Sequence, residues 1–83
     1  MIESKEQVLG DFRQKAQAFL AEPSFVTGID LDDASVTLKR YVLTVMQDEA
    51  LGSALARVQK QIRALDVAAV SELLAQVESK LAD

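Results

Sequence analysis

The acidic run DLDD at residues 30–33 is the part of this 83-residue chain best suited to binding a metal ion. Hard cations take several carboxylate oxygens from one short, flexible loop. The run does not match an EF-hand, because Ser35 stands where that loop needs Gly and Tyr41 stands where it needs Glu. Capping of the following helix accounts for the acidic residues without an ion. We therefore expect no metal site.

Three basic residues, Arg57, Lys60 and Arg63, recur at intervals of three and form a basic ridge along one predicted helix. Such a ridge can contact nucleic acid phosphates or an acidic protein. The net charge of −4 and the lack of interleaved aromatic residues disfavour nucleic acid. We expect a solvated face, and keep a small regulator that contacts nucleic acid through this ridge as the alternative function.

The residue types on which many small enzymes depend are missing. With no Cys and no His, the chain has no thiol nucleophile, no imidazole base and no thiolate or imidazole ligand for zinc. The remaining candidates are carboxylates, lysines and the single tyrosine, Tyr41. Paired carboxylates catalyse only where a cleft separates their pKa values, so we expect no enzymatic activity, no catalytic residue and no cofactor.

Composition places the chain among small globular proteins. It is 49% hydrophobic and 27% charged, which suits one domain over residues 1–83. Residues 1–6 lack the pattern of a secretory signal, no apolar stretch is long enough for a membrane span, and the lack of Cys favours a reducing compartment. We expect a cytoplasmic protein that does not contact a membrane.

The N-terminal segment has clear signals for a helix over residues 4–21. Ser4 and Gln7 match a capping box, in which each side chain binds the other residue's backbone N–H. Apolar residues then recur at spacings of three and four, as on one face of a helix. Pro23 disfavours helical geometry at Glu22 and should end the helix.

The C-terminal half carries two apolar stripes with the spacing of a helix bundle. Their phases differ at Asp66, a suitable N-cap, which predicts helices over 49–65 and 67–82. Asp48 is the candidate N-cap of the first, and one uninterrupted helix is the alternative. The centre of the first stripe, which should be core, is Leu55, Val58 and Ile62.

The middle of the chain is ambiguous. Residues 22–33 mix apolar side chains with Pro, Gly and Asp, which predicts a loop held against the core. Residues 33–47 are predicted to be helical with Asp32 or Asp33 as N-cap, while their β-branched residues leave a hairpin over 24–45 as the alternative. The predicted fold is thus an all-α bundle of three or four helices, with an α+β fold as the alternative.

The chain has more large apolar residues than one small core readily buries, which suggests a second surface. Those outside the stripes include Ile2, Val36 and Leu73. The candidates for partner binding are Phe25, Val26, Ile29, Leu43 and Met46. We predict a non-catalytic protein-interaction module, or a small accessory or chaperone-like subunit, that presents an apolar helix face to a protein partner or to a second copy in a homodimer.

Overall fold

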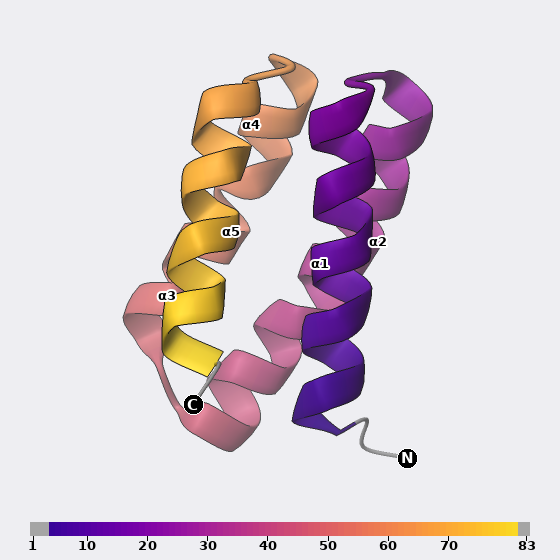
Figure 1. Cartoon of the computed structure of the whole chain (residues 1–83). Helices are drawn as coiled ribbons and strands as arrows, with labels where there is room; N and C mark the ends of the chain where they lie inside the picture. Colours follow the sequence, from indigo (N-terminus) through magenta and orange to yellow (C-terminus); the bar gives the residue numbers. More distant parts are fainter. Residues whose placement is uncertain (1–3, 82–83) are drawn as a thin grey trace.

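The computed structural model describes residues 4–81 and consists of helices packed side by side (Figure 1). Of the described residues 87% are helical and none is in a strand, which confirms the predicted all-α bundle and rules out the hairpin over 24–45. The elements are α1 (Lys5–Ala21), α2 (Phe25–Tyr41), the π-helix η1 (Val42–Met46), α3 (Glu49–Ala56), α4 (Val58–Arg63) and α5 (Val67–Leu81).

The start and the end of α1 follow the sequence signals. The Gln7 N–H donates to Ser4 Oγ at 3.2 Å, and the Ser4 N–H donates to Gln7 Oε1 at 3.1 Å. Glu22, directly before Pro23, has a non-helical conformation, with φ −145° and ψ 81°, and ends the helix. The prediction of a helix over 4–21 is confirmed.

The N-terminus of α2 corrects the prediction of a loop over 22–33. Ser24 is the N-cap: its N–H donates to Thr27 Oγ1 at 3.1 Å, and the Thr27 N–H donates to Ser24 Oγ at 3.3 Å. Asp32 and Asp33 therefore lie inside the helix and do not cap it. This capping box has Thr at the position where Glu or Gln is usual, and the turn-forming residues that follow obscured it.

Gly28 lies within α2 because α4 comes close to it there. A Cβ atom at this position would lie 2.6 Å from Ile62 Cγ2, so no larger residue fits without a shift. The glycine thus marks a contact between two helices, although in the sequence it favours a turn.

Two N-caps organise the C-terminal half as predicted. Asp48 accepts the Leu51 N–H at 3.0 Å, and Asp66 Oδ1 accepts the Ala69 N–H at 3.1 Å. The break at Asp66 is confirmed, and the uninterrupted helix is wrong. The segment 49–65 is divided once more at Arg57, whose N–H binds the Ala54 carbonyl, so α3 and α4 are two short helices.

The core is built by α1 and α2 together with the helices that pack on them. α1 packs against α2 and α5, and α2 also packs against η1, α3 and α4. Leu55 and Val58 are buried as predicted, whereas Ile62 is only half-buried. Leu73 is buried too, and Ile2 lies outside the described residues. The largest fully buried side chains are Phe12, Phe19, Leu31, Leu38, Leu51 and Leu55.

No helix within residues 4–81 combines the length and the apolar character needed to cross a bilayer. The longest two, α1 and α2, are 17 residues each and amphipathic, with one face in the core and the other exposed.

Candidate functional site

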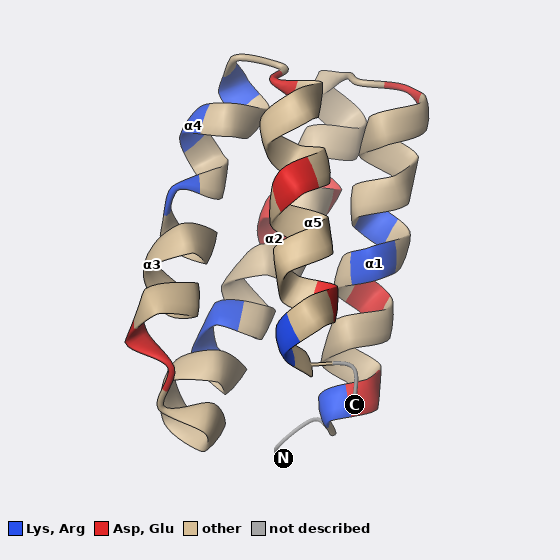
Figure 2. Ribbon diagram, turned by 60° about the vertical axis from the view of Figure 1, so that its left-hand side comes forward, with Lys and Arg blue, Asp and Glu red and all other residues tan. Residues whose placement is uncertain are grey.

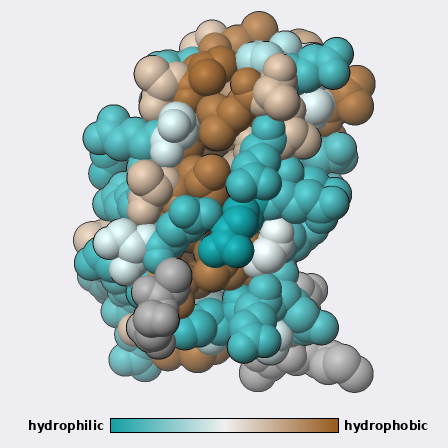
Figure 3. All heavy atoms as spheres, in the orientation of Figure 1, coloured by the Kyte–Doolittle hydropathy of each residue, from teal (hydrophilic) through white to brown (hydrophobic). Residues whose placement is uncertain are grey.

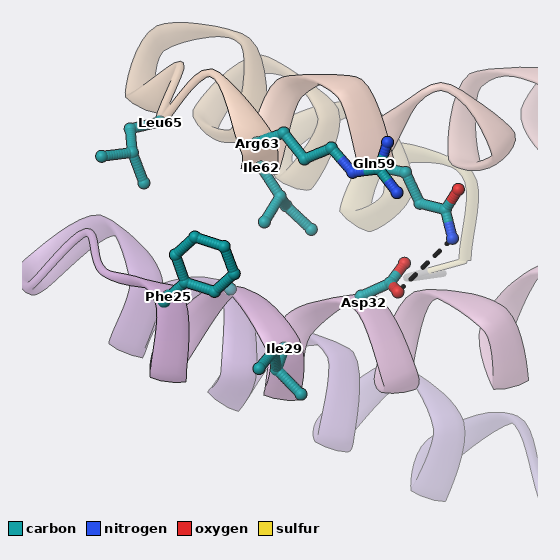
Figure 4. A pocket seen from close by; sticks show the side chains of 8 residues that line it. Phe25, Ile29, Asp32, Gln59, Ile62, Arg63 and Leu65 are labelled. Atoms are coloured by element: carbon teal, nitrogen blue, oxygen red, sulfur yellow. Dashed lines mark hydrogen bonds between the residues drawn. The ribbon is translucent and has the colours of Figure 1, made fainter.

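A hollow of about 290 Å³ lies between the first half of α2 and α4; we call it the α2–α4 groove. Figure 4 shows its two walls, one from α2 and one from α4 and the turn after it. Apolar side chains from both walls line it, and polar groups stand toward one end. Its lining residues are Phe25, Gly28, Ile29, Asp32, Gln59, Ile62, Arg63 and Leu65.

The apolar residues of the groove are unusually exposed for their size. Phe25 is 83% exposed, Ile29 57% and Leu65 48%, while Ile62 is half-buried between them and the core. On the face shown in Figure 3, hydrophobic residues gather at the end of the bundle where α1 passes to α2 and α4 passes to α5. Exposed apolar residues around a concave surface are typical of a binding site.

The backbone of Leu65 supports a role for this surface. α4 ends in a Schellman motif, in which the Leu65 N–H donates to the Ile62 carbonyl at 3.0 Å and the Asp66 N–H to the Gln61 carbonyl at 2.9 Å. Leu65 holds the left-handed position of this motif with a φ of 53°, where glycine is favoured. Backbone strain of this kind is often found at functional surfaces.

Asp32 supplies the polar end of the groove. Its Oδ2 accepts one long hydrogen bond from Gln59 Nε2, at 3.4 Å, across the two walls (Figure 4). Its Oδ1 is buried and has no hydrogen-bond partner within residues 4–81. A buried acceptor without a donor costs about 1–3 kcal/mol. The groove therefore combines apolar walls with a residue, Asp32, that has one buried and unpaired carboxylate oxygen.

The five predicted partner-binding residues do not form one surface. Phe25 and Ile29 line the groove, and Val26 follows Phe25 and is 71% exposed. Leu43 lies roughly 27 Å from Phe25 along the axis of α2 and η1, at 1.5 Å per residue. There it contacts Gly52. Met46, also in η1, is half-buried and packs against the core. Only the first part of the set belongs to the candidate site.

The basic ridge is split by the break between α3 and α4. Arg57 lies at the break, Lys60 lies on α4, and Arg63 ends α4 and lines the groove. All three are exposed, and Figure 2 shows basic positions on α4 and at the break between α3 and α4. Within the described residues their side chains form no ion pair, since the bridges there join Arg13 to Glu78 and Lys80 to Asp48.

The other candidates from the sequence are structural. Asp30 and Asp33 are exposed on α2, and the described residues contain no group of three or more acidic side chains placed to hold a metal ion. Tyr41 is half-buried against the core.

Five residues that line the groove are not among the binding residues predicted from the sequence: Gly28, Asp32, Gln59, Ile62 and Leu65. Asp32 was considered only in the acidic run and as a helix cap, and Ile62 only as core. The φ of Leu65 and the unpaired oxygen of Asp32 follow from packing and leave no local signal in the sequence.

The chain matches no family model, and neither a curated protein nor a solved structure shows significant similarity to it. Its function therefore has to be argued from the groove.

Proposed function

We propose that this chain is a non-catalytic protein-binding module that receives an apolar segment of a partner protein in the α2–α4 groove. The observation that carries the proposal is that exposed Phe25 and Ile29 of α2 and exposed Leu65 of the turn after α4 line one hollow. A cytoplasmic location fits a chain without cysteines.

The energetics of burial suit an anchor site. Covering an exposed phenylalanine or leucine side chain contributes about 1.5–3 kcal/mol. In protein interfaces a few anchor residues in well-packed pockets carry most of the binding energy, and the contacts around them mainly exclude water. An amphipathic helix laid along the groove is the binding mode that this geometry favours.

Site-specific photo-crosslinking tests the proposal. Phe25 is replaced by the photoreactive p-benzoylphenylalanine, and the same residue at Val45, exposed in η1 at the other end of the bundle, is the matched control. We expect a discrete cross-linked partner, identified by mass spectrometry, from position 25 alone. Equal adducts from both positions, or none from position 25, would contradict a binding site at the groove. An adduct of twice the chain mass would identify the partner as a second copy.

Contact with nucleic acid is the alternative, and it rests on the exposed side chains of Arg57, Lys60 and Arg63, which form no ion pair within residues 4–81. It predicts a mobility shift with mixed DNA or RNA at low salt that weakens steeply as salt is added. A shift that disappears in the Lys60→Glu variant would favour this alternative, and no shift at low salt would remove it.

A further inference from the structure

We propose that the partner bound at the α2–α4 groove is a second copy of this chain, placed face to face in a two-fold dimer whose axis runs along the groove. The inference rests on the proposed protein-binding function and names the partner. Three observations carry it: the opposite charges of the two helices, the matching levels of their residues along the groove, and the exposed apolar side chains at one end.

The two helices that form the groove have opposite charge. Residues 25–38 contain three acidic residues and no Lys or Arg, whereas residues 50–65 contain three basic residues and no acidic one. The basic residues of α2 lie in its last turn, beyond the groove. One side of the groove is therefore negative and the other side is positive.

One charged residue of each helix stands beside the groove. Asp33 is one turn from Ile29, and Lys60 is one turn from Arg63. Because Ile29 and Arg63 line the groove, the two charges flank it on opposite sides. Both side chains are exposed, and of the ion pairs within residues 4–81 none joins α2 to α4. Both charges are therefore available to a partner.

Contacts across the groove show which residues of α2 and α4 lie at the same level. Asp32 is hydrogen-bonded to Gln59. Gly28, one turn earlier on α2, lies against Ile62, on the next turn of α4. The two helices therefore run in opposite directions, and each level on α2 has a corresponding level on α4.

A two-fold axis along the groove brings opposite charges together. Rotation by 180° about this axis keeps each residue at its level and places α2 of one copy opposite α4 of the other. Asp33 and Lys60 each directly follow one residue of the hydrogen-bonded pair, so Asp33 of each copy faces Lys60 of the other. In such an isologous interface the same contact occurs twice.

The same rotation brings together the exposed apolar side chains at one end of the groove. Phe25 is three residues before Gly28 and Leu65 is three residues after Ile62, so the two side chains lie near one level, on opposite walls (Figure 4). In the dimer, Phe25 of each copy packs against Leu65 of the other. This contact covers side chains that are 83% and 48% exposed in the single chain, which favours association.

The opposite charges of α2 and α4 select against other partners. Nucleic acid or a uniformly acidic helix would be attracted by α4 and repelled by α2, and a uniformly basic helix would be in the reverse position. A second copy has both signs of charge at matching levels, together with the apolar side chains. Two-fold dimers are also the commonest oligomers.

Sedimentation equilibrium and methyl NMR together test the dimer. Two of the three isoleucines, Ile29 and Ile62, line the groove, so their methyl resonances should shift as the protein concentration is raised and the dimer forms. A chain that stays monomeric up to about 1 mM, where even weak association is visible, overturns the proposal. A dimer whose formation leaves both resonances unchanged overturns it too.

Reversal of charge tests the two-fold arrangement. Asp33→Lys and Lys60→Glu should each bring like charges together and weaken the dimer at least about tenfold. A mixture of the two variants should form a heterodimer about as strong as the unmodified dimer, because both of its contacts then join opposite charges. Glu72→Lys, at an exposed acid on α5, is the matched control and should leave the dimer unchanged.

Circular dichroism checks that the charge variants are folded, which is expected because both positions are exposed. A mixture that associates no more strongly than the single variants overturns the proposed arrangement. Equal weakening by Glu72→Lys overturns it as well, since the loss would then follow from net charge.

The outcomes also separate this inference from the function on which it rests. A labelled helical peptide of roughly 15 residues, with leucines at intervals of three and four, serves as a different apolar partner. If the chain stays monomeric and the peptide shifts the Ile29 and Ile62 resonances, the dimer is wrong and the groove remains a binding site. If neither the peptide nor a second copy shifts them at about 1 mM, both proposals are wrong.

Discussion

The two ends of the bundle expose the same kinds of residue in different surroundings. At one end, Phe25 and Leu65 border the α2–α4 groove, and Leu65 has a positive φ. At the other end, Leu43 in η1 is 41% exposed and contacts Gly52, and Gln47, which ends η1, has a φ of 55°. Among residues 4–81, the groove end also has a hollow of about 290 Å³ and a residue, Asp32, with a buried oxygen that lacks a donor. Exposure and strain alone therefore do not define the candidate site.

The two ends also differ in how far their side chains can adapt. An added Cβ at Gly28 would lie 2.6 Å from Cγ2 of Ile62, a β-branched residue on a helix, where one χ1 rotamer is strongly preferred. At Gly52 it would meet both Cδ2 and Cγ of Leu43, but Leu43 is 41% exposed and can change its χ1 rotamer. Leu43 can thus move aside more easily than Ile62.

The largest effect is expected for the core that supports both ends. Leu55→Ala removes a side chain that is 2% exposed and should lower the free energy of unfolding by about 2–5 kcal/mol. Ile62→Ala, in the half-buried groove wall, should cost clearly less. Urea unfolding followed by circular dichroism measures both. Equal losses would mean that the groove wall is part of the core.

Three glycine substitutions test how easily Ile62 and Leu43 move aside. Gly28→Ala forces a shift of Ile62 and should lower the free energy of unfolding by about 1–3 kcal/mol. Gly52→Ala should change it little, because Leu43 can move. Gly10→Ala, with no atom near the new methyl group, should raise it by about 0.5–1 kcal/mol. If Gly28→Ala and Gly52→Ala change the free energy of unfolding equally, the two ends do not differ in how easily their side chains move.

Binding should distinguish the ends without a change in folding. Phe25→Ser should weaken binding of an apolar helical peptide about tenfold, or about 1.4 kcal/mol, because it removes a large apolar side chain that lines the groove. Val45→Ser, at an exposed position in η1, is the matched control and should bind normally. Fluorescence titration measures the affinity and thermal unfolding checks the fold. A fall in melting temperature for Phe25→Ser as large as for Leu55→Ala would identify Phe25 as core.

The smallest effect concerns the two residues with positive φ. Leu65→Gly and Gln47→Gly each relieve a left-handed conformation, and each should raise the free energy of unfolding by up to about 1 kcal/mol. Only Leu65→Gly should also weaken peptide binding, because Leu65 lines the groove. Urea unfolding measures the gain in stability, and the peptide titration measures the loss of affinity. Normal binding by Leu65→Gly would show that the strain has no role in recognition.

The fold was predictable wherever local signals decided it. α1 follows from the Ser4–Gln7 capping box and from Pro23, and the start of α5 from Asp66. α2 was missed over its first half, because the residues that favour a turn there are kept in a helix by packing against α1 and α4. Gly28 shows the reason directly: its contact is Ile62, on another helix, and such a distant contact leaves no local signal.

The candidate site was predictable only in its apolar part. Phe25 and Ile29 stood out because they lie off the periodic stripes. The burial of Asp32 Oδ1 without a hydrogen-bond donor depends on how Gln59 and the rest of α4 lie across α2. Leu43 and Met46 were predicted to belong to the same surface as Phe25 because residues 22–33 were expected to form a loop. In the structure α2 and η1 follow each other directly, so both residues are separated from Phe25 along the helix axis.

The shortness of α4 gives the groove one wall that can open by itself. α4 has six residues, no side-chain cap at its N-terminus and one buried residue, Val58, and a helix this short is not stable without tertiary contacts. Such segments unfold locally at a lower free energy than the whole domain. Amide hydrogens of α4 should therefore exchange with solvent faster than those in the middle of α1. A partner that binds only when α4 is folded would stabilise this helix and slow the exchange of its amide hydrogens.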